Sequence, residues 1–250
     1  LDQTGFFPEG GGQYADKGVL GNVNVLDVHE KNDIIYHTTD ASLEPGTKVL
    51  GKINWEERFE KMQQHTGEHI VSGIVNERFG YQNVGFHLSG DYCTMDFSGP
   101  ITKEQLKEIE LEANGAVFKN LDIDVSYPSK DVLAQMEYRS KIEIEGQVRI
   151  VTVPDYDVCA CCAPHVKKTG EIGLIKLVNM ANYKGGVRIT MLCGFRALRD
   201  YEKKDSNVKE ISAEEEIFDL PEELSDVSAE NVYQFPIKNM FGFVGIDDDL

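Results

Sequence analysis

Two histidines flank a glutamate in the stretch QHTGEHIVSG, residues 64–73, as His65, Glu68 and His69. If this stretch is helical, the four-residue spacing puts both imidazoles on the same side of the helix. Such a pair supplies half of the four ligands that Zn²⁺ takes in a tetrahedral site. The pattern His-x-x-Glu-His also occurs in one class of zinc peptidases, in which the glutamate acts as general base. The stretch therefore predicts a zinc site, either in a peptidase or in another kind of zinc protein.

A second group of candidate ligands lies far downstream, in CACCAPHVKKTGEIG at residues 159–173. Cys161 and His165 are four residues apart, which is enough chain for both side chains to turn inward from a loop. Together with His65 and His69 they would complete a site of three histidines and one cysteine. Cys159 and Cys162 are alternative thiol ligands, because either could replace Cys161 if the loop runs in a different direction.

The peptidase alternative needs a third ligand from a downstream glutamate. Glu143 and Glu145 lie at about the right separation, but KIEIEGQV, residues 141–148, is typical of a strand hairpin. This alternative also leaves Cys161 and His165 without a role. A thiolate ligand would moreover lower the Lewis acidity of the zinc, which disfavours a peptidase.

The composition points to a folded cytoplasmic protein. The chain has 250 residues, 41% of them apolar, which favours one or two domains. No run of 18 apolar residues occurs, so we expect no membrane span. The five cysteines are an odd number and three lie within four residues, which favours metal binding in a reducing cytosol over disulfides. The chain begins with Leu1 inside a β-rich segment, so we expect N-terminal residues to be missing.

Charge is unevenly distributed along a chain whose formal net charge is −18. Residues 165–204 carry nine lysines or arginines against three acids, whereas residues 210–250 carry twelve acids and one lysine. We therefore expect one basic surface and an acidic C-terminal segment.

Hydrophobic periodicity indicates an α+β protein. Residues 1–55 are typical of β-strands around a glycine-rich loop, and residues 55–79 are typical of a helix that ends at Gly80, with the two histidines on a flank of its apolar stripe. The remaining expected elements are a loop and strand over 81–99, a helix after the Thr102–Gln105 capping box, a short helix over 129–139, a hairpin turning at Glu145-Gly146, two strands joined near Gly185-Gly186, and a helix starting at 195.

Four segments in a fixed order resemble the editing domain of alanyl-tRNA synthetase, and resemble the free-standing alanyl-tRNA editing proteins more closely. The resemblance covers about residues 1–204 and implies a zinc ion held by His65, His69, Cys161 and His165. Where the family usually has Gly-Thr before the last histidine, this chain has Ala163-Pro164, so we expect a different local backbone. The four segments are FFPEGGGQYADKG, QQHTGEHI, CACCAPHVKKTGEIG and GVRITMLCG.

For the fold, the resemblance implies a small N-terminal β-barrel over residues 1–55. This barrel would pack on a zinc-containing editing domain over residues 56–204. That domain would be an antiparallel sheet with helices packed on one face, and the metal would lie in the cleft between them. Residues 205–250 would form an acidic C-terminal segment of undefined structure.

For the activity, the resemblance implies zinc-dependent hydrolysis of the aminoacyl ester in seryl-tRNA(Ala), and to some extent glycyl-tRNA(Ala). The physical need is clear, because a pocket sized for alanine rejects neither glycine nor one added hydroxyl strongly. A second site must therefore remove the error. A zinc peptidase and a zinc-stabilised tRNA-binding module without catalysis are the alternatives.

The resemblance also places the loop Gly85-Phe86-His87 beside the metal, with Asn83 able to contact the seryl group and His87 a candidate base. Glu68 stands where the synthetase often has a threonine. We expect Glu68 either to contact the substrate amino group or to face solvent, with solvent favoured.

The expected macromolecular partner is the acceptor end of tRNA(Ala). Lys167, Lys168 and Arg188 flank the metal loop and the strand after it, so they are the cations most suited to contact its phosphates. In longer relatives a C-terminal extension contacts tRNA or mediates dimerisation, so a homodimer is a further expectation.

Overall fold

The structure is a computed structural model that describes residues 1–140 and 146–215. It confirms the α+β class with antiparallel sheets. Residues Leu1–Tyr201 form one compact unit, and the second unit begins at Glu202. Within the described residues no helix is long and apolar enough to cross a bilayer.

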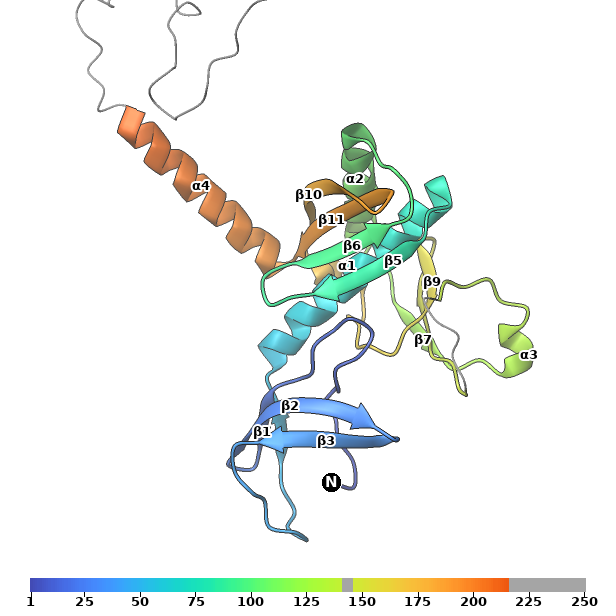
Figure 1. Cartoon of the computed structure of the whole chain (residues 1–250), viewed down its shortest axis with the longest axis vertical. Helices are drawn as coiled ribbons and strands as arrows, with labels where there is room; N and C mark the ends of the chain where they lie inside the picture. Colours follow the sequence, from blue (N-terminus) through green and yellow to red (C-terminus); the bar gives the residue numbers. More distant parts are fainter. Residues whose placement is uncertain (141–145, 216–250) are drawn as a thin grey trace, which may run out of the picture. The chain divides into compact units, whose positions relative to one another are not determined.

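The N-terminal strands form a four-stranded sheet in the order β3-β2-β1-β4, drawn in blue in Figure 1. Its strands are β1 (Gly18–Leu20), β2 (Val23–Lys31), β3 (Ile34–Thr39) and β4 (Gly51–Ile53). A small core of Phe6, Ala15, Leu20, Val25 and Val28 packs against it. In this order β3 and β4 are the edge strands, and closure of the sheet into a barrel stays a prediction.

Helix α1 (Trp55–Phe79) has the bounds that the sequence predicts. The Asn54 side chain accepts a hydrogen bond from the backbone N–H of Glu57, and Gly80 ends the helix in the left-handed conformation, with φ 68°. Burial extends beyond the predicted apolar stripe, because every residue from Lys61 to Val75 is buried, including the two histidines on its flank. The main sheet, α2, β9 and the glycine-rich loop contact the middle of this helix from several sides.

The main sheet has the strand order β10-β11-β6-β5, and α1 and α2 pack against one of its faces (Figure 1). Its strands are β5 (Asn83–Leu88), β6 (Cys93–Phe97), β10 (Ile175–Tyr183) and β11 (Gly186–Cys193). Helix α2 (Lys103–Lys119) begins at the capping box that Thr102 and Gln105 form, as the sequence predicts. The core between sheet and helices contains Ile70, Met95, Phe97, Ile109 and Ile189.

Residues 83–88, expected as a loop, form the edge strand β5 instead. A bulge between Asn83 and Gly85 interrupts its pairing with β6. A Cβ at Gly85 would lie 2.7 Å from Asp96 Oδ2, so the glycine allows the strand to approach β6 closely. The glycine that suggested a loop therefore marks a bulge within a strand.

A third sheet has the order β7-β8-β9. Its strands are β7 (Asp124–Ser126), β8 (Ile150–Val153) and β9 (Asp157–Ala160). Helix α3 (Lys130–Leu133) lies between β7 and β8; the short helix predicted over 129–139 is therefore present, but it is only four residues long. The hairpin predicted to turn at Glu145-Gly146 has its first strand on residues 141–145, which lie outside the described residues. The hairpin that the structure describes in this region is formed by β8 and β9.

The chain continues from β9 through a loop at 161–168 to the short 3₁₀ helix η1 (Thr169–Ile172) and then to β10. The β10–β11 hairpin confirms the strand pair predicted near Gly185-Gly186. Helix α4 (Phe195–Glu215) starts where the sequence predicts a helix. Of the predicted acidic segment 205–250, residues 205–215 are helical and residues 216–250 lie outside the described residues.

Candidate metal centre

Four predicted ligands from two distant segments meet in one cluster. His65 and His69 come from α1, and Cys161 and His165 from the loop after β9. Their four ligand atoms all lie within 4.8 Å of one another. The three histidines are buried and Cys161 is partly exposed. The fold therefore brings together the set that the resemblance implies.

The spacing of these atoms suits one tetrahedral ion. Cys161 Sγ lies 3.6 Å from His65 Nε2 and 3.4 Å from His165 Nε2. Zinc–nitrogen and zinc–sulfur bonds of ordinary length at a tetrahedral angle would separate a nitrogen and a sulfur ligand by about 3.6 Å. The donor types and their separations both fit zinc.

Outer contacts fix which ring nitrogen of each histidine can bind a metal. His65 Nδ1 lies 3.0 Å from Gln13 Oε1, so it donates to this amide oxygen. His165 Nδ1 lies 3.1 Å from Thr66 Oγ1, whose own proton goes to the Met62 carbonyl. Both rings therefore keep the Nε2 lone pair on the side of Cys161, as a metal ligand requires.

His69 follows the same pattern with a charged partner. Its Nδ1 lies 2.9 Å from Asp157 Oδ2, at the start of β9. This contact is an ion pair without hydrogen-bond geometry, and the charge of the carboxylate favours the proton on Nδ1, which would leave Nε2 for the cluster. All three histidines are thus anchored through Nδ1 by groups from three separate places: the glycine-rich loop, α1 itself and β9.

Two of the four candidate ligands already have the protonation that a metal requires, whereas His69 would lose a proton on binding, because the effect of burial is outweighed by Asp157 and Cys161, which raise its pKa to about 10. Burial would raise the pKa of the Cys161 thiol, but the surrounding imidazoles, His65 first, lower the pKa to about 2. Burial, together with the positive charge of His69, lowers the pKa of His165 to about 3. A thiolate and a neutral imidazole are the forms in which these side chains bind a metal.

The two alternative thiols occupy different surroundings. Cys162 is exposed and lies beside Gly10 and Gly11 of the glycine-rich loop. Cys159 is buried, and its sulfur is grouped with His69 and Asp157 rather than with the other histidines. Among the three clustered thiols, Cys161 is the one that lies among all three imidazoles.

Glu68 is buried beside the cluster, so the expectation that it faces solvent was wrong. Its Oε1 accepts hydrogen bonds from Ser72 Oγ at 2.7 Å and Asn83 Nδ2 at 2.5 Å. Its Oε2 lies 3.8 Å from His69 Nε2. Asn83, on the edge strand β5, is thereby tied to α1 rather than placed in a mobile loop.

The other residues predicted beside the metal divide into two groups. Phe86 packs its ring 4.9 Å from the ring of His65 and also contacts Gly12, while Gly85 lies at the bulge of β5. His87 is exposed and meets Tyr14 edge-on at 6.0 Å between ring centroids. The structure brings Phe86 to the cluster and leaves His87 on the other side of the strand, where no contact with the four candidate ligands is recorded among the described residues.

The three predicted tRNA-binding cations differ in how they are engaged. Arg188 forms two hydrogen bonds with Asp96, at 2.6 and 2.7 Å, and lies over the ring of Tyr183. Lys168 Nζ pairs with Asp122 at 2.8 Å. No ion pair is recorded for the Lys167 ammonium among the described residues, which leaves it the most available of the three.

Sequence reasoning missed the outer partners of the histidines. Gln13 ends the glycine-rich motif FFPEGGGQ, so its place in that motif was an available signal. Thr66 lies in the segment QQHTGEHI and had the same signal, whereas Asp157 lies in none of the four segments, because its partner is set by a contact across the fold. The glutamates Glu143 and Glu145, which the peptidase alternative needs, lie outside the described residues.

Comparison with known proteins agrees with the motifs. Residues 148–190 match the family described as the threonyl and alanyl tRNA synthetase second additional domain. The chain is 34% identical to the alanyl-tRNA editing protein AlaX-L of Pyrococcus horikoshii, over 80% of this chain and 54% of that protein. It is 30% identical to the alanyl-tRNA editing protein Aarsd1 of Bos taurus, over 85% and 49%.

The same chain is 31% identical to the alanine–tRNA ligase of Ignicoccus hospitalis, over 85% of this chain and 25% of the ligase. The chain thus spans about half the length of the editing proteins it matches and a quarter of this ligase. These findings confirm the resemblance to alanyl-tRNA editing proteins that the four motifs predicted.

Proposed function

We propose that this chain is a zinc-dependent hydrolase that edits mischarged tRNA(Ala) in trans, removing serine and, to a smaller extent, glycine. The observation that carries the proposal is the convergence of His65, His69, Cys161 and His165 within 4.8 Å. It is supported by the similarity to proteins that are named alanyl-tRNA editing proteins.

The four converging side chains would hold the zinc, and Gln13, Thr66 and Asp157 would orient its histidine ligands. When bound, zinc would supply Lewis acidity for the ester carbonyl or for an attacking water. The remaining chemistry falls to the chain itself. Its residues must hold the aminoacyl group beside the cluster and limit the access of bulk water.

Glu68 and Asn83 are the residues we assign to the aminoacyl group. Glu68 is a buried carboxylate whose Oε2 lies 3.8 Å from a ligand nitrogen of His69, so a substrate ammonium held there would be next to the cluster. Asn83 bonds the same carboxylate and fixes its orientation. Phe86 would form an apolar wall, because it packs against His65.

The terminal nucleotides of the tRNA must reach this cluster, and Lys167 and Lys168 follow His165 directly in the sequence. We propose that these two lysines contact phosphates of the acceptor end. Arg188 would contribute less, because Asp96 already binds its guanidinium. The same proposal includes four further expectations: a closed barrel over residues 1–55, a domain boundary at 55/56, a cytoplasmic location and a homodimer.

The test is to incubate the purified chain with seryl-tRNA(Ala) and with alanyl-tRNA(Ala) and to follow loss of the ester. We expect the seryl ester to be hydrolysed much faster, and expect a chelator to abolish the activity until zinc is restored. Binding of the tRNA without hydrolysis of either ester would support the non-catalytic module instead. Cleavage of peptides by a Cys161→Ala variant that keeps its zinc would support a peptidase.

A further inference from the structure

On the Nδ1 side of His69, Asp157 and then Arg139 form a series of charged contacts that leads away from the cluster. Asp157 Oδ2 lies 2.9 Å from His69 Nδ1. On its other side Asp157 is bound by Arg139, whose Nε lies 2.7 Å from Oδ1 and whose Nη2 lies 2.9 Å from Oδ2. We propose that Asp157 and Arg139 are positioning residues, which set the orientation and tautomer of His69 for the zinc of the proposed function.

The two-pronged contact fixes the carboxylate more firmly than a single hydrogen bond would. The side chain of Asp157 is 1% exposed and that of Arg139 is 13% exposed. A carboxylate this buried would be strongly unfavourable without a charged partner. With both oxygens held by the guanidinium, Asp157 cannot rotate away from His69 without breaking a buried ion pair.

The backbone holds both members of the pair in place. The Arg139 N–H donates to the Val158 carbonyl at 2.8 Å, and the Ala160 N–H donates to the Arg139 carbonyl at 2.9 Å. Arg139 is therefore bonded to the strand that Asp157 begins. On α1, a Cβ at Gly73 would lie only 2.0 Å from the Tyr156 carbonyl oxygen, so the helix that carries His69 is pressed against the turn before Asp157.

A second metal ion is the competing explanation, since His69, Asp157 and Cys159 also form a group of potential ligands. The guanidinium of Arg139 argues against it. It occupies both oxygens of Asp157, and its positive charge would repel a cation at the same position.

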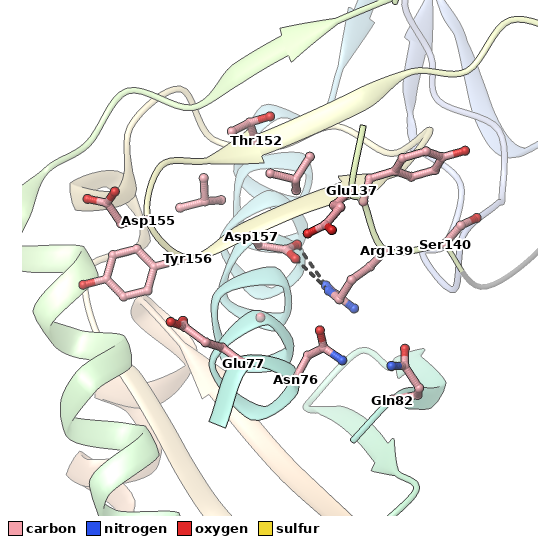
Figure 2. A pocket seen from close by; sticks show the side chains of 14 residues that line it. Asn76, Glu77, Gln82, Glu137, Arg139, Ser140, Thr152, Asp155, Tyr156 and Asp157 are labelled. Atoms are coloured by element: carbon pink, nitrogen blue, oxygen red, sulfur yellow. Dashed lines mark hydrogen bonds and ion pairs between the residues drawn. The ribbon is translucent and has the colours of Figure 1, made fainter. Parts of the chain in front are cut away.

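Arg139 and Asp157 line a cavity of about 540 Å³. Figure 2 shows their side chains in contact with each other among the other residues of the lining. Asn76, Glu77 and Gln82 also line the cavity, and none of the four candidate zinc ligands does. The guanidinium can thus be reached from a side of Asp157 that does not pass through the cluster. If Arg139 is shortened, a small guanidinium ion has room to take its place.

The first experiment measures Zn²⁺ affinity by competition with a chromophoric chelator. We expect Asp157→Asn to weaken zinc binding by about 10- to 100-fold, the range seen for outer partners of metal ligands, and Arg139→Gln by a smaller factor. The matched control is Arg196→Gln. Arg196 is similarly buried in an ion pair with Glu60, and among the described residues it makes no contact with the four candidate ligands, so this variant should bind zinc as tightly as the unchanged chain.

The second experiment restores the missing group. In Arg139→Ala, millimolar guanidinium should recover most of the lost zinc affinity, whereas urea, which is similar in shape but uncharged, should not. Arg139→Lys keeps the charge without the two-pronged contact and should lie between Arg139→Gln and the unchanged chain. Thermal unfolding of each metal-free variant separates lost affinity from lost folding.

The inference is overturned if Asp157→Asn and Arg139→Gln fold and bind zinc as tightly as the unchanged chain, or if guanidinium and urea act alike. It is also overturned, together with the proposed zinc centre, if the unchanged chain binds no zinc. Conversely, a chain that shows the expected affinities but hydrolyses no seryl-tRNA(Ala) supports the positioning role and rejects only the proposed reaction.

Discussion

Two arginine–aspartate pairs of the same two-pronged geometry stand in different surroundings. Arg139 and Asp157 are nearly buried and end at the ring of a candidate metal ligand. Arg188 is 40% exposed and Asp96 14%, and this pair lies beside the ring of Tyr183 on the main sheet. In the sequence, Arg188 lies in the segment GVRITMLCG, whereas Arg139 lies in none of the four segments.

The difference shows that the surroundings of such a pair decide its role. The inner pair, Arg139 and Asp157, lies in a buried region of low dielectric, where polar interactions are stronger than in water. The orientation of Asp157 should therefore have a large effect on His69. The outer pair of Arg188 and Asp96 is screened by water, so it contributes little to stability. Because Asp96 binds the guanidinium of Arg188, this cation is only partly available to a phosphate. Changes near the inner pair should therefore alter metal binding and folding, and changes among the surface cations should alter only tRNA binding.

The largest effect should come from the thiol at the centre of the inner region. Cys161→Ala removes the only ligand sulfur that lies among all three imidazoles, so zinc affinity should fall by more than about 100-fold and seryl-tRNA(Ala) hydrolysis should be lost. Cys162→Ala, at the adjacent exposed position, should leave both unchanged. Equal losses in the two variants would mean that the wrong thiol has been assigned.

The next effect concerns the packing that supports Asp157. Gly73→Ala should destabilise the fold by about 2–3 kcal/mol or more, because the new Cβ would overlap the Tyr156 carbonyl. Gly115→Ala, in α2, meets no atom within 4 Å and should stabilise the fold by about 0.5–1 kcal/mol. Chemical denaturation measures both, and a Gly73→Ala variant as stable as Gly115→Ala would show that the turn is free to move.

Surface cations should give a smaller effect, on tRNA alone. The double change Lys167→Glu and Lys168→Glu should weaken tRNA binding by about tenfold near 0.1 M salt and flatten its dependence on salt. Arg188→Gln should change affinity less, because Asp96 already holds the guanidinium. Filter binding over a range of salt concentrations measures both. Unchanged affinity in the lysine variant would remove these residues from the interface.

The smallest effect lies in the N-terminal sheet. Burial lowers the pKa of His37, so the unfolded chain binds this proton more readily than the folded one. Stability should therefore fall slightly as the pH drops below the ordinary histidine pKa of about 6.5. Thermal scans at pH 5.5 and 7.5 should show this loss, and His37→Gln should reduce it. An identical pH dependence in that variant would assign the loss to other groups.

Local sequence signals predicted the elements that depend on local contacts. The bounds of α1 followed from its periodicity and from Gly80, and the start of α2 from the Thr102–Gln105 capping box. The β10–β11 hairpin followed from its paired glycines. Residue types and spacing suggested a site of three histidines and one cysteine, and the motif resemblance selected Cys161 among the three clustered thiols, because no local signal joins positions 96 residues apart.

The errors arose where distant contacts decide the outcome. Glu68 was expected in solvent, yet Asn83, fifteen residues away, and Ser72 enclose its carboxylate. Residues 83–88 were expected as a loop because Gly85 is read locally as a turn, yet it packs against Asp96 on the neighbouring strand. Asp157 and Arg139 were overlooked because their significance appears only once β9 is placed against α1.

The account depends most on one ion bound by four side chains from two segments, and a crystal of the chain prepared with zinc tests this directly. Anomalous diffraction at the zinc absorption edge should show a single peak bonded to Nε2 of His65, His69 and His165 and to Sγ of Cys161. A peak bonded instead to Asp157 or Cys159, or no peak at this cluster in a zinc-loaded crystal, would contradict it.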